Sequence, residues 1–166
     1  MELKDTLRAI SNETRGWLKA WAGDFTEAEA NEPVGNDTAP HPLAWQLGHL
    51  ACTEDDVACL FSTEPSPAPL VPDSLRAVCA TGSPPPPPGT EYPPLATLWI
   101  LLECTHERLL GVLDAASLAD LDRPPRVTNP YFHTLGQGVY EAALHENYHV
   151  GQIGALRKRL DKSRIG

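Results

Sequence analysis

The chain has 166 residues, which is enough to bury a hydrophobic core, and we expect one domain spanning residues 1–166. Its 13 basic and 22 acidic residues give a net charge of −9, so we expect neither a nucleic-acid partner nor a membrane surface. No apolar run approaches the ~20 residues of a membrane span. The charged N-terminus lacks the apolar region of a secretory signal, so we expect a cytoplasmic protein.

Four segments show the apolar period of about 3.6 residues that is typical of amphipathic helices. They cover residues 3–21, 42–61, 94–114 and 134–160. Pro42 suits the start of the second helix, and Thr134 with Gln137 matches a capping box at the start of the fourth. Strand signals are weak. The pattern therefore predicts an all-α fold, a four-helix bundle.

The connections between these helices are expected to be long. Residues 34–41 and 115–133 should be loops, the second with a helical turn at 117–121. Eleven of the 17 prolines lie between residues 65 and 94, and those at 84–88 are consecutive. Because proline excludes helix interiors and central strands, we expect a polyproline II rod at 84–88 within a proline-rich crossover between helices 2 and 3. A docking motif for an SH3-like or WW-like module is the alternative interpretation.

The cysteines show no metal-binding or disulfide pattern. No Cys-x-x-Cys pair or zinc-finger spacing occurs among Cys52, Cys59, Cys79 and Cys104. Since the reducing cytoplasm keeps thiols free, we expect no disulfide.

The fourth predicted helix carries two histidines, His145 and His149, four residues apart, so both side chains can reach one metal ion. Apolar residues share their side of the helix, so the pair should point into the bundle, where unsatisfied imidazoles are costly. A metal ion bound through their neutral nitrogens satisfies both. His49, beside Gly48 on the second helix, is the candidate third ligand, and a plain packing role is its alternative. Three ligands leave coordination positions open, as in catalytic sites.

The string from His145 to His149 also matches the His-Glu-x-x-His signature of zinc peptidases. That function needs a further ligand downstream, but only 17 residues follow His149 and Asp161 is the only candidate among them. We therefore do not expect a peptidase. Glu146 is a candidate general base beside an open metal site, with simple solvent exposure as the alternative.

Four more residues are candidates for binding a substrate. Gln152 follows His149 by one helical turn, and Trp45 precedes His49 by one turn and could wall a pocket. Arg123 and Arg126 flank two prolines and could hold an anionic group at the mouth of the bundle. The structural alternatives are a polar residue at the core edge, a core tryptophan and ordinary surface charge.

Two segments give the chain its resemblance to a known family. They are the ten residues His-Pro-Leu-Ala-Trp-Gln-Leu-Gly-His-Leu, which begin at His41, and the helix that runs from Thr134 through His145 and His149 to Gln152. Both resemble the DinB/YfiT-like metalloenzyme superfamily. The resemblance implies a four-helix bundle with a long crossover that holds one divalent metal ion (zinc, nickel, iron or manganese) with His49, His145 and His149. The proline-rich segment departs from the family pattern.

The resemblance also suggests a function. It implies a metal-dependent transferase that activates a low-molecular-weight thiol, such as bacillithiol or mycothiol, for attack on an electrophilic small-molecule substrate. It further implies a homodimer formed through helix faces, for which Trp17 and Trp21 are candidates. A non-catalytic metal-binding stress or interaction protein and a metal-dependent hydrolase with Glu146 as base are the alternatives.

Overall fold

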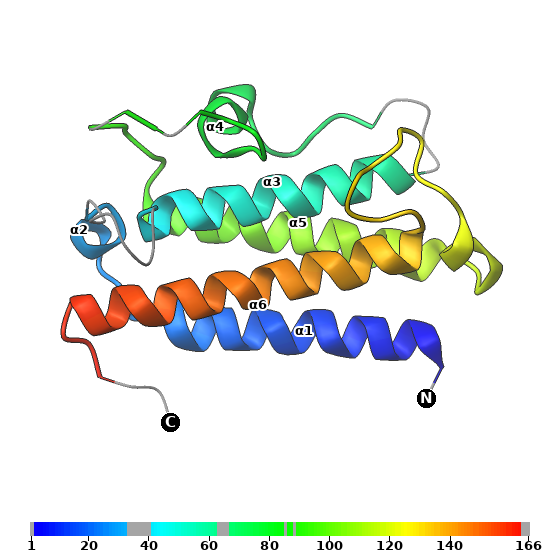
Figure 1. The fold of residues 1–166 in the computed structure, drawn as a ribbon, viewed down its shortest axis with the longest axis horizontal. Coiled ribbons are helices and arrows are strands. Elements are labelled where there is room, and N and C mark those ends of the chain that lie inside the picture. The colour runs from blue at the N-terminus through cyan, green and yellow to red at the C-terminus, as the bar shows by residue number, and fades with distance from the viewer. Residues whose placement is uncertain (1, 33–40, 63–66, 85, 88, 164–166) are drawn as a thin grey trace.

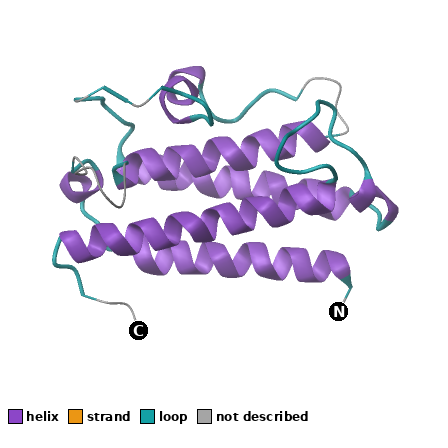
Figure 2. Cartoon of the chain, viewed as in Figure 1, coloured by secondary structure: helices purple, strands orange, loops and turns teal. Residues whose placement is uncertain are grey.

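The computed structural model describes residues 2–32, 41–62, 67–84, 86–87 and 89–163, and among these it contains helices and no strand (Figures 1 and 2). The four long helices are α1 (Leu3–Ala22), α3 (Leu43–Phe61), α5 (Leu95–Ala115) and α6 (Leu135–Arg159). Two short helices, α2 (Glu27–Ala30) and α4 (Asp73–Cys79), and the 3-10 turn η1 (Ala119–Asp122) lie between them. Each long helix agrees with its predicted range to within one residue at each end, which confirms the all-α bundle.

The long helices are arranged as two parallel pairs (Figure 1). Helix α1 packs along α6, and α3 packs along α5. The first pair runs in one direction and the second in the other, and α3 also packs against α6. Because α3 and α5 are parallel, the chain that joins them travels back along the bundle, and α4 lies on this return path beside α3.

The proline-rich segment is more structured than we expected. Helix α4 occupies the proline-free stretch of residues 73–79, directly after Pro72, which is its N-cap residue. The prolines therefore delimit a helix that the proline content had concealed. The proposed rod at 84–88 includes residues 85 and 88, which lie outside the described residues, as do residues 34–40 of the first predicted loop.

The helix starts follow local capping rules. The Thr134 hydroxyl accepts a hydrogen bond from the backbone N–H of Gln137. The Gln137 side chain returns to the backbone N–H of His133, at 2.8 Å, so the predicted capping box is shifted by one residue. The helical turn predicted at 117–121 is η1. None of the helices in the described part of the chain is both long and apolar enough to cross a membrane.

Two apolar clusters and one polar layer fill the bundle. Leu18, Leu102 and Ile153 belong to one cluster, and Val57, Leu109 and Val139 belong to the other. Between the clusters, each long helix contributes buried polar side chains, and these are Arg15, Glu54, Thr105, His106 and Glu146. This layer of polar side chains therefore crosses all four long helices and separates the two apolar clusters.

Candidate metal centre

Three histidines from two helices converge inside the bundle. His49 comes from α3, and His145 and His149 come from successive turns of α6. The Nε2 atom of His145 lies 3.2 Å from Nε2 of His49 and 3.2 Å from Nε2 of His149. His49 and His149 are buried, and one ligand atom from each of the three residues lies within 4.8 Å of the others. The set could hold a metal ion.

Hydrogen bonds on the far side of two rings fix their tautomers. Nδ1 of His49 lies 2.7 Å from the carbonyl oxygen of Cys79, and Nδ1 of His149 lies 3.1 Å from the side-chain oxygen of Gln46. Since both oxygens only accept, each Nδ1 carries the hydrogen and each Nε2 presents a lone pair to the centre. The Gln46 amide is held in this orientation because its nitrogen donates to the His41 carbonyl, at 3.0 Å.

Burial keeps the three rings neutral. It lowers the pKa of His145 to about 4 and the pKa of His149 to about 3, and it also lowers the pKa of His49. His145 Nε2 can donate one hydrogen at most, so at least one of the two 3.2 Å contacts brings two lone pairs together. Nδ1 of His145 is buried and has no hydrogen-bond partner among the described residues. A cation at the centre would satisfy all three Nε2 atoms, so the donor set fits a divalent metal.

Helix α4 supplies carbonyl groups to this centre, a contribution that the sequence did not reveal. The Nε1–H of Trp45 donates to the carbonyl of Val78, at 2.7 Å, one residue before the Cys79 carbonyl that bonds His49. The Trp45 ring is buried and stacks on His49 with ring centroids 4.6 Å apart. Trp45 therefore packs against a candidate ligand, and it is absent from the lining of the cavity of about 270 Å³ that opens beside His49 and His145.

Gly48 allows α4 to approach α3 this closely. A Cβ atom at this position would lie 2.9 Å from Sγ of Cys79 and 3.2 Å from a methyl carbon of Leu75. Gly48 was the one sequence signal of a close neighbour beside His49. The neighbour is α4, and the sequence did not predict this helix because prolines surround it.

A cavity of about 270 Å³ opens beside His49 and His145. Its apolar wall is formed by Val57, Phe132 and Ala142. The remaining lining residues are polar or amphipathic, and they are Thr53, Thr81, Tyr131 and Glu141. Sequence reasoning missed these residues, although Glu141 precedes His145 by four positions and so shares its face of α6. A small molecule in this cavity would contact two of the three histidines.

Glu146 requires a correction. Its carboxylate is neither exposed nor beside the histidines, because the next position on a helix points about 100° away and reaches α1. One oxygen lies 2.6 Å from Nε of Arg15, and the other accepts a hydrogen bond from the Thr14 hydroxyl, at 2.9 Å. Burial raises the pKa of Glu146, although the adjacent guanidinium acts against this shift. Its role in the structure is an ion pair.

The other substrate-binding candidates lie apart from the cavity. Arg123 donates to the carbonyl of Phe61 and Arg126 donates to the carbonyl of Ser62, each at 2.6 Å. Cations are favourable at this C-terminal end of α3 because of the helix dipole. Gln152 is half-buried one turn after His149, and its side-chain oxygen has no hydrogen-bond partner in the part of the chain described. None of the three lines the cavity at the histidines.

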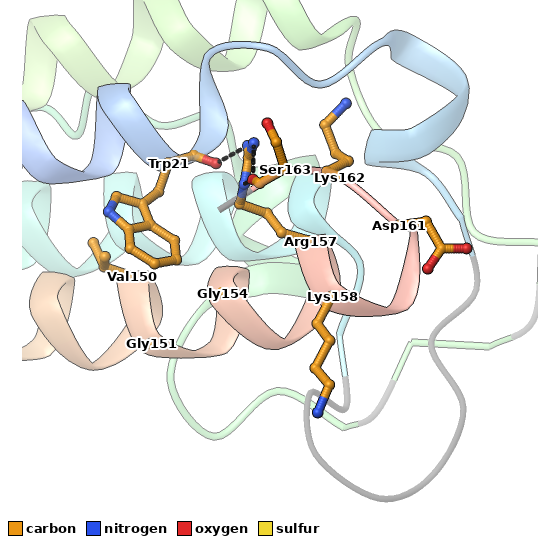
Figure 3. Close-up of a pocket in the computed structure, with 9 residues that line it drawn as sticks. All are labelled: Trp21, Val150, Gly151, Gly154, Arg157, Lys158, Asp161, Lys162 and Ser163. Carbon is orange, nitrogen blue, oxygen red and sulfur yellow. Dashed lines mark hydrogen bonds between the residues drawn. The ribbon is translucent and has the colours of Figure 1, made fainter. Parts of the chain in front are cut away.

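A larger cavity, of about 650 Å³, lies near the C-terminal end of α6 and contains none of the three histidines (Figure 3). The Trp21 ring and Gly154 form part of its wall. Two of its cations are already paired, since Arg157 bonds Asp24 and Lys162 bonds Glu29. This cavity is separate from the candidate metal centre.

The cysteines are free, as the sequence predicted. Burial raises the pKa of Cys52 and of Cys79 to about 12, so both stay protonated at neutral pH. Neither side chain is therefore suited to act as a nucleophile.

Comparison with known protein families agrees with the helical fold. No curated protein sequence matches the chain. The model of the DinB superfamily matches residues 7–153, a range that contains all four long-helix cores and the three histidines. The match extends over most of the chain, and the protein belongs to the DinB superfamily.

Proposed function

We propose that the protein is a metal-dependent transferase that joins a low-molecular-weight thiol to an electrophilic small molecule. The observation that carries this proposal is the convergence of the Nε2 atoms of three histidines beside a cavity of about 270 Å³. A centre with three protein ligands leaves room for exogenous ligands, as catalytic sites do.

His49, His145 and His149 would hold the ion. When bound, a divalent ion supplies a Lewis acid that lowers the pKa of a thiol and favours the thiolate at neutral pH. The Nδ1 hydrogen bonds of His49 and His149 keep both rings oriented toward the centre. Packing of the Trp45 ring over His49 excludes water from that side.

The cavity would hold the electrophile. Val57, Phe132 and Ala142 provide an apolar wall, and among the described residues no Lys or Arg side chain lines the cavity, which favours a substrate without a negative charge. In the transfer, the thiol sulfur forms a bond to an electrophilic carbon, and the leaving group departs with the electron pair of the bond that breaks. The Glu141 carboxylate lines the cavity and could accept the thiol proton.

The hydrolase alternative with Glu146 as base loses its structural support. The Glu146 carboxylate is buried against Arg15 and Thr14 and has no place in the cavity. A non-catalytic metal-binding protein with the same histidines is the alternative that the assay must distinguish.

The test is thiol-dependent turnover by the metal-loaded protein. Cysteine, glutathione, bacillithiol and mycothiol would each be combined with monochlorobimane, a fluorogenic alkyl chloride. We expect turnover with at least one thiol and loss of turnover in His149→Ala. Stoichiometric metal binding without turnover of any combination would favour the non-catalytic alternative.

We further propose a homodimer in the cytoplasm, where low-molecular-weight thiols are abundant. Tyr140, Leu144 and Tyr148 form an exposed apolar stripe along one side of α6, and Tyr148 is 64% exposed. Trp17 of α1 is also half exposed, whereas Trp21 is partly buried against the core. Sedimentation of the parent protein and of Tyr148→Glu would test this, and a monomeric parent would contradict it.

A further inference from the structure

We propose that Arg76 is a positioning residue for the metal centre: its ion pair with Asp55 fixes α4 so that the Cys79 carbonyl holds His49 in the tautomer that binds metal. The inference rests on the proposed metal binding, but it concerns Arg76 on α4 and Asp55 on α3, which are not metal ligands. Neither Arg76 nor Asp55 contacts the histidine Nε2 atoms.

Asp55 is the residue of α3 that binds α4 and the segment before it. Its carboxylate is fully buried, a location that is costly unless the charge is paired and hydrogen-bonded. One oxygen accepts hydrogen bonds from the backbone N–H groups of Leu70 and Val71, at 2.9 and 3.1 Å. The same oxygen lies 2.6 Å from Nη2 of Arg76, and the other lies 2.8 Å from Nη1 of Arg108. These four N–H donors hold the Asp55 carboxylate and the segment that enters α4 in one position relative to each other.

Arg76 connects α4 to α3 through both arms of its guanidinium. Nη2 bonds Asp55, and Nη1 bonds the adjacent Asp56, at 2.5 Å. Its Nε also donates to the carbonyl of Val71, at 3.3 Å, so the same side chain closes the turn before α4. A planar guanidinium can make these divergent bonds at once, whereas the single ammonium of lysine cannot reproduce them.

Helix α4 depends on such external contacts. It has seven residues, and an isolated helix of that length is unstable in water. Its main packing partner among the described helices is α3. The clamp is formed by Arg76 with Asp55 and Asp56, and it lies one turn before the carbonyls of Val78 and Cys79. These carbonyls at the helix end have no partners within α4, and they accept from Trp45 and His49.

The consequence for His49 follows from its tautomer. A neutral imidazole in water favours hydrogen on Nε2, which would block the atom that faces the other two histidines. The Cys79 carbonyl reverses this preference by accepting the Nδ1 hydrogen at 2.7 Å. Thr81, which lines the cavity, follows two residues later, so the clamp also positions part of the cavity wall.

The first readout needs no metal. Nitrogen-15 spectra of the histidine side chains in the metal-free protein report which ring nitrogen carries the hydrogen. We expect Nδ1–H for His49 in the parent and a substantial Nε2–H population in Arg76→Gln. The inference is overturned if His49 keeps Nδ1–H in the folded Arg76→Gln variant.

The second readout is the affinity for Zn²⁺, measured by competition with a chromophoric chelator. Loss of the hydrogen-bond partner of a metal-ligating histidine typically weakens metal binding about 10- to 100-fold. We expect a loss of up to this size in Arg76→Gln, because Arg76 acts on that partner through α4. Arg108→Gln is the matched control because it removes a cation from the same Asp55 carboxylate without a contact to α4. An equal loss in the control would show a general effect of destabilisation and would overturn the inference.

Arg76→Lys keeps the assay decisive if Arg76→Gln does not fold. Lysine retains the charge beside Asp55 but cannot also bond Asp56 and Val71, so we expect an affinity between the parent and the glutamine variant, with the same direction of change in the tautomer. Parental affinity and tautomer in this variant would contradict the inference. A parent that binds no Zn²⁺ would instead contradict the proposed function, while the nitrogen-15 readout would still test the clamp.

Discussion

Nε of Arg15 lies 2.6 Å from a carboxylate oxygen of Glu146, and both side chains are buried in the middle of the bundle. The same guanidinium lies 2.9 Å from Glu54 on α3, so one cation joins α1, α3 and α6. Burial alone would lower the pKa of Arg15, but Glu54 and Glu146 outweigh burial and raise it. The polar layer therefore fixes how these helices are aligned along the bundle axis. His145 directly precedes Glu146, a residue of this layer.

Removal of Arg15 should destabilise the bundle strongly. Arg15→Met leaves the Glu54 and Glu146 carboxylates buried without their cation, and breaking a buried pair in this way typically costs about 3–5 kcal/mol. Urea denaturation at neutral pH measures this change. Lys19→Met is the control, because the exposed Lys19–Glu103 pair should contribute less than about 1 kcal/mol. Similar losses in both variants would contradict the importance of the buried layer.

Glu146→Gln should separate stability from metal binding. The substitution preserves shape but removes the charge that pairs with Arg15, so the melting temperature should fall. Metal content per folded chain should stay at the parental value, because Glu146 does not face the histidine Nε2 atoms. If the folded variant keeps its metal and loses turnover completely, Glu146 has the catalytic role that the structure argues against.

The stability of the metal-free protein should decrease with acidification. The folded-state pKa values of His145 and His149, about 4 and about 3, lie below the usual value of about 6.5 in an unfolded chain. The unfolded state therefore binds more protons between these limits, and the free energy of unfolding falls as the pH decreases from about 6.5 toward 3.

This pH dependence can be measured from urea midpoints at several pH values in this window. His149→Gln removes one of the depressed groups, so its stability should fall less steeply than that of the parent. Equal slopes in the two proteins would show that the buried imidazole does not contribute.

The sequence predicted the four long helices and the three histidines because both depend on local periodicity. Leu98 and Leu102, and His145 and His149, repeat at helical spacing, and the bundle follows from burial of those faces. The contribution of α4 depends instead on Asp55, whose partners at residues 70, 71, 76 and 108 are distant in the chain. No local pattern reveals such a carboxylate, and the surrounding prolines argued against a helix.

Glu146 shows a second limit of local patterns. The His-Glu-x-x-His string suggested a catalytic glutamate, but the partner that determines its role, Arg15, is 131 residues earlier in the chain. His145 and His149 share one face of α6. Glu146 lies on the neighbouring face, which packs against α1. The role of Glu146 therefore depended on the packing of α1 against α6.

Gly48→Ala should weaken both packing and metal binding. The added Cβ would lie 2.9 Å from Sγ of Cys79, so this buried side chain of α4 must shift, and overpacking of this kind typically costs about 1–3 kcal/mol. We also expect lower affinity for Zn²⁺, because the Cys79 carbonyl moves away from His49.

The control for this substitution is Gly111→Ala on α5. No atom of the described residues outside its own helix turn lies within 4 Å of a Cβ at that position. This change should stabilise the helix by about 0.8–1 kcal/mol and leave the affinity for Zn²⁺ unchanged. Parental Zn²⁺ affinity in a folded Gly48→Ala protein would contradict the proposed contact between α4 and His49.

The most direct test of the metal centre is the metal content of the purified, untagged protein by elemental analysis, beside His49→Ala and His133→Ala. His133 is an exposed histidine outside the centre and serves as the control. We expect about one divalent ion per chain in the parent and in His133→Ala, and little in His49→Ala. An absence of metal from the parent after reconstitution, or parental metal content in His49→Ala, would contradict the interhelical histidine site.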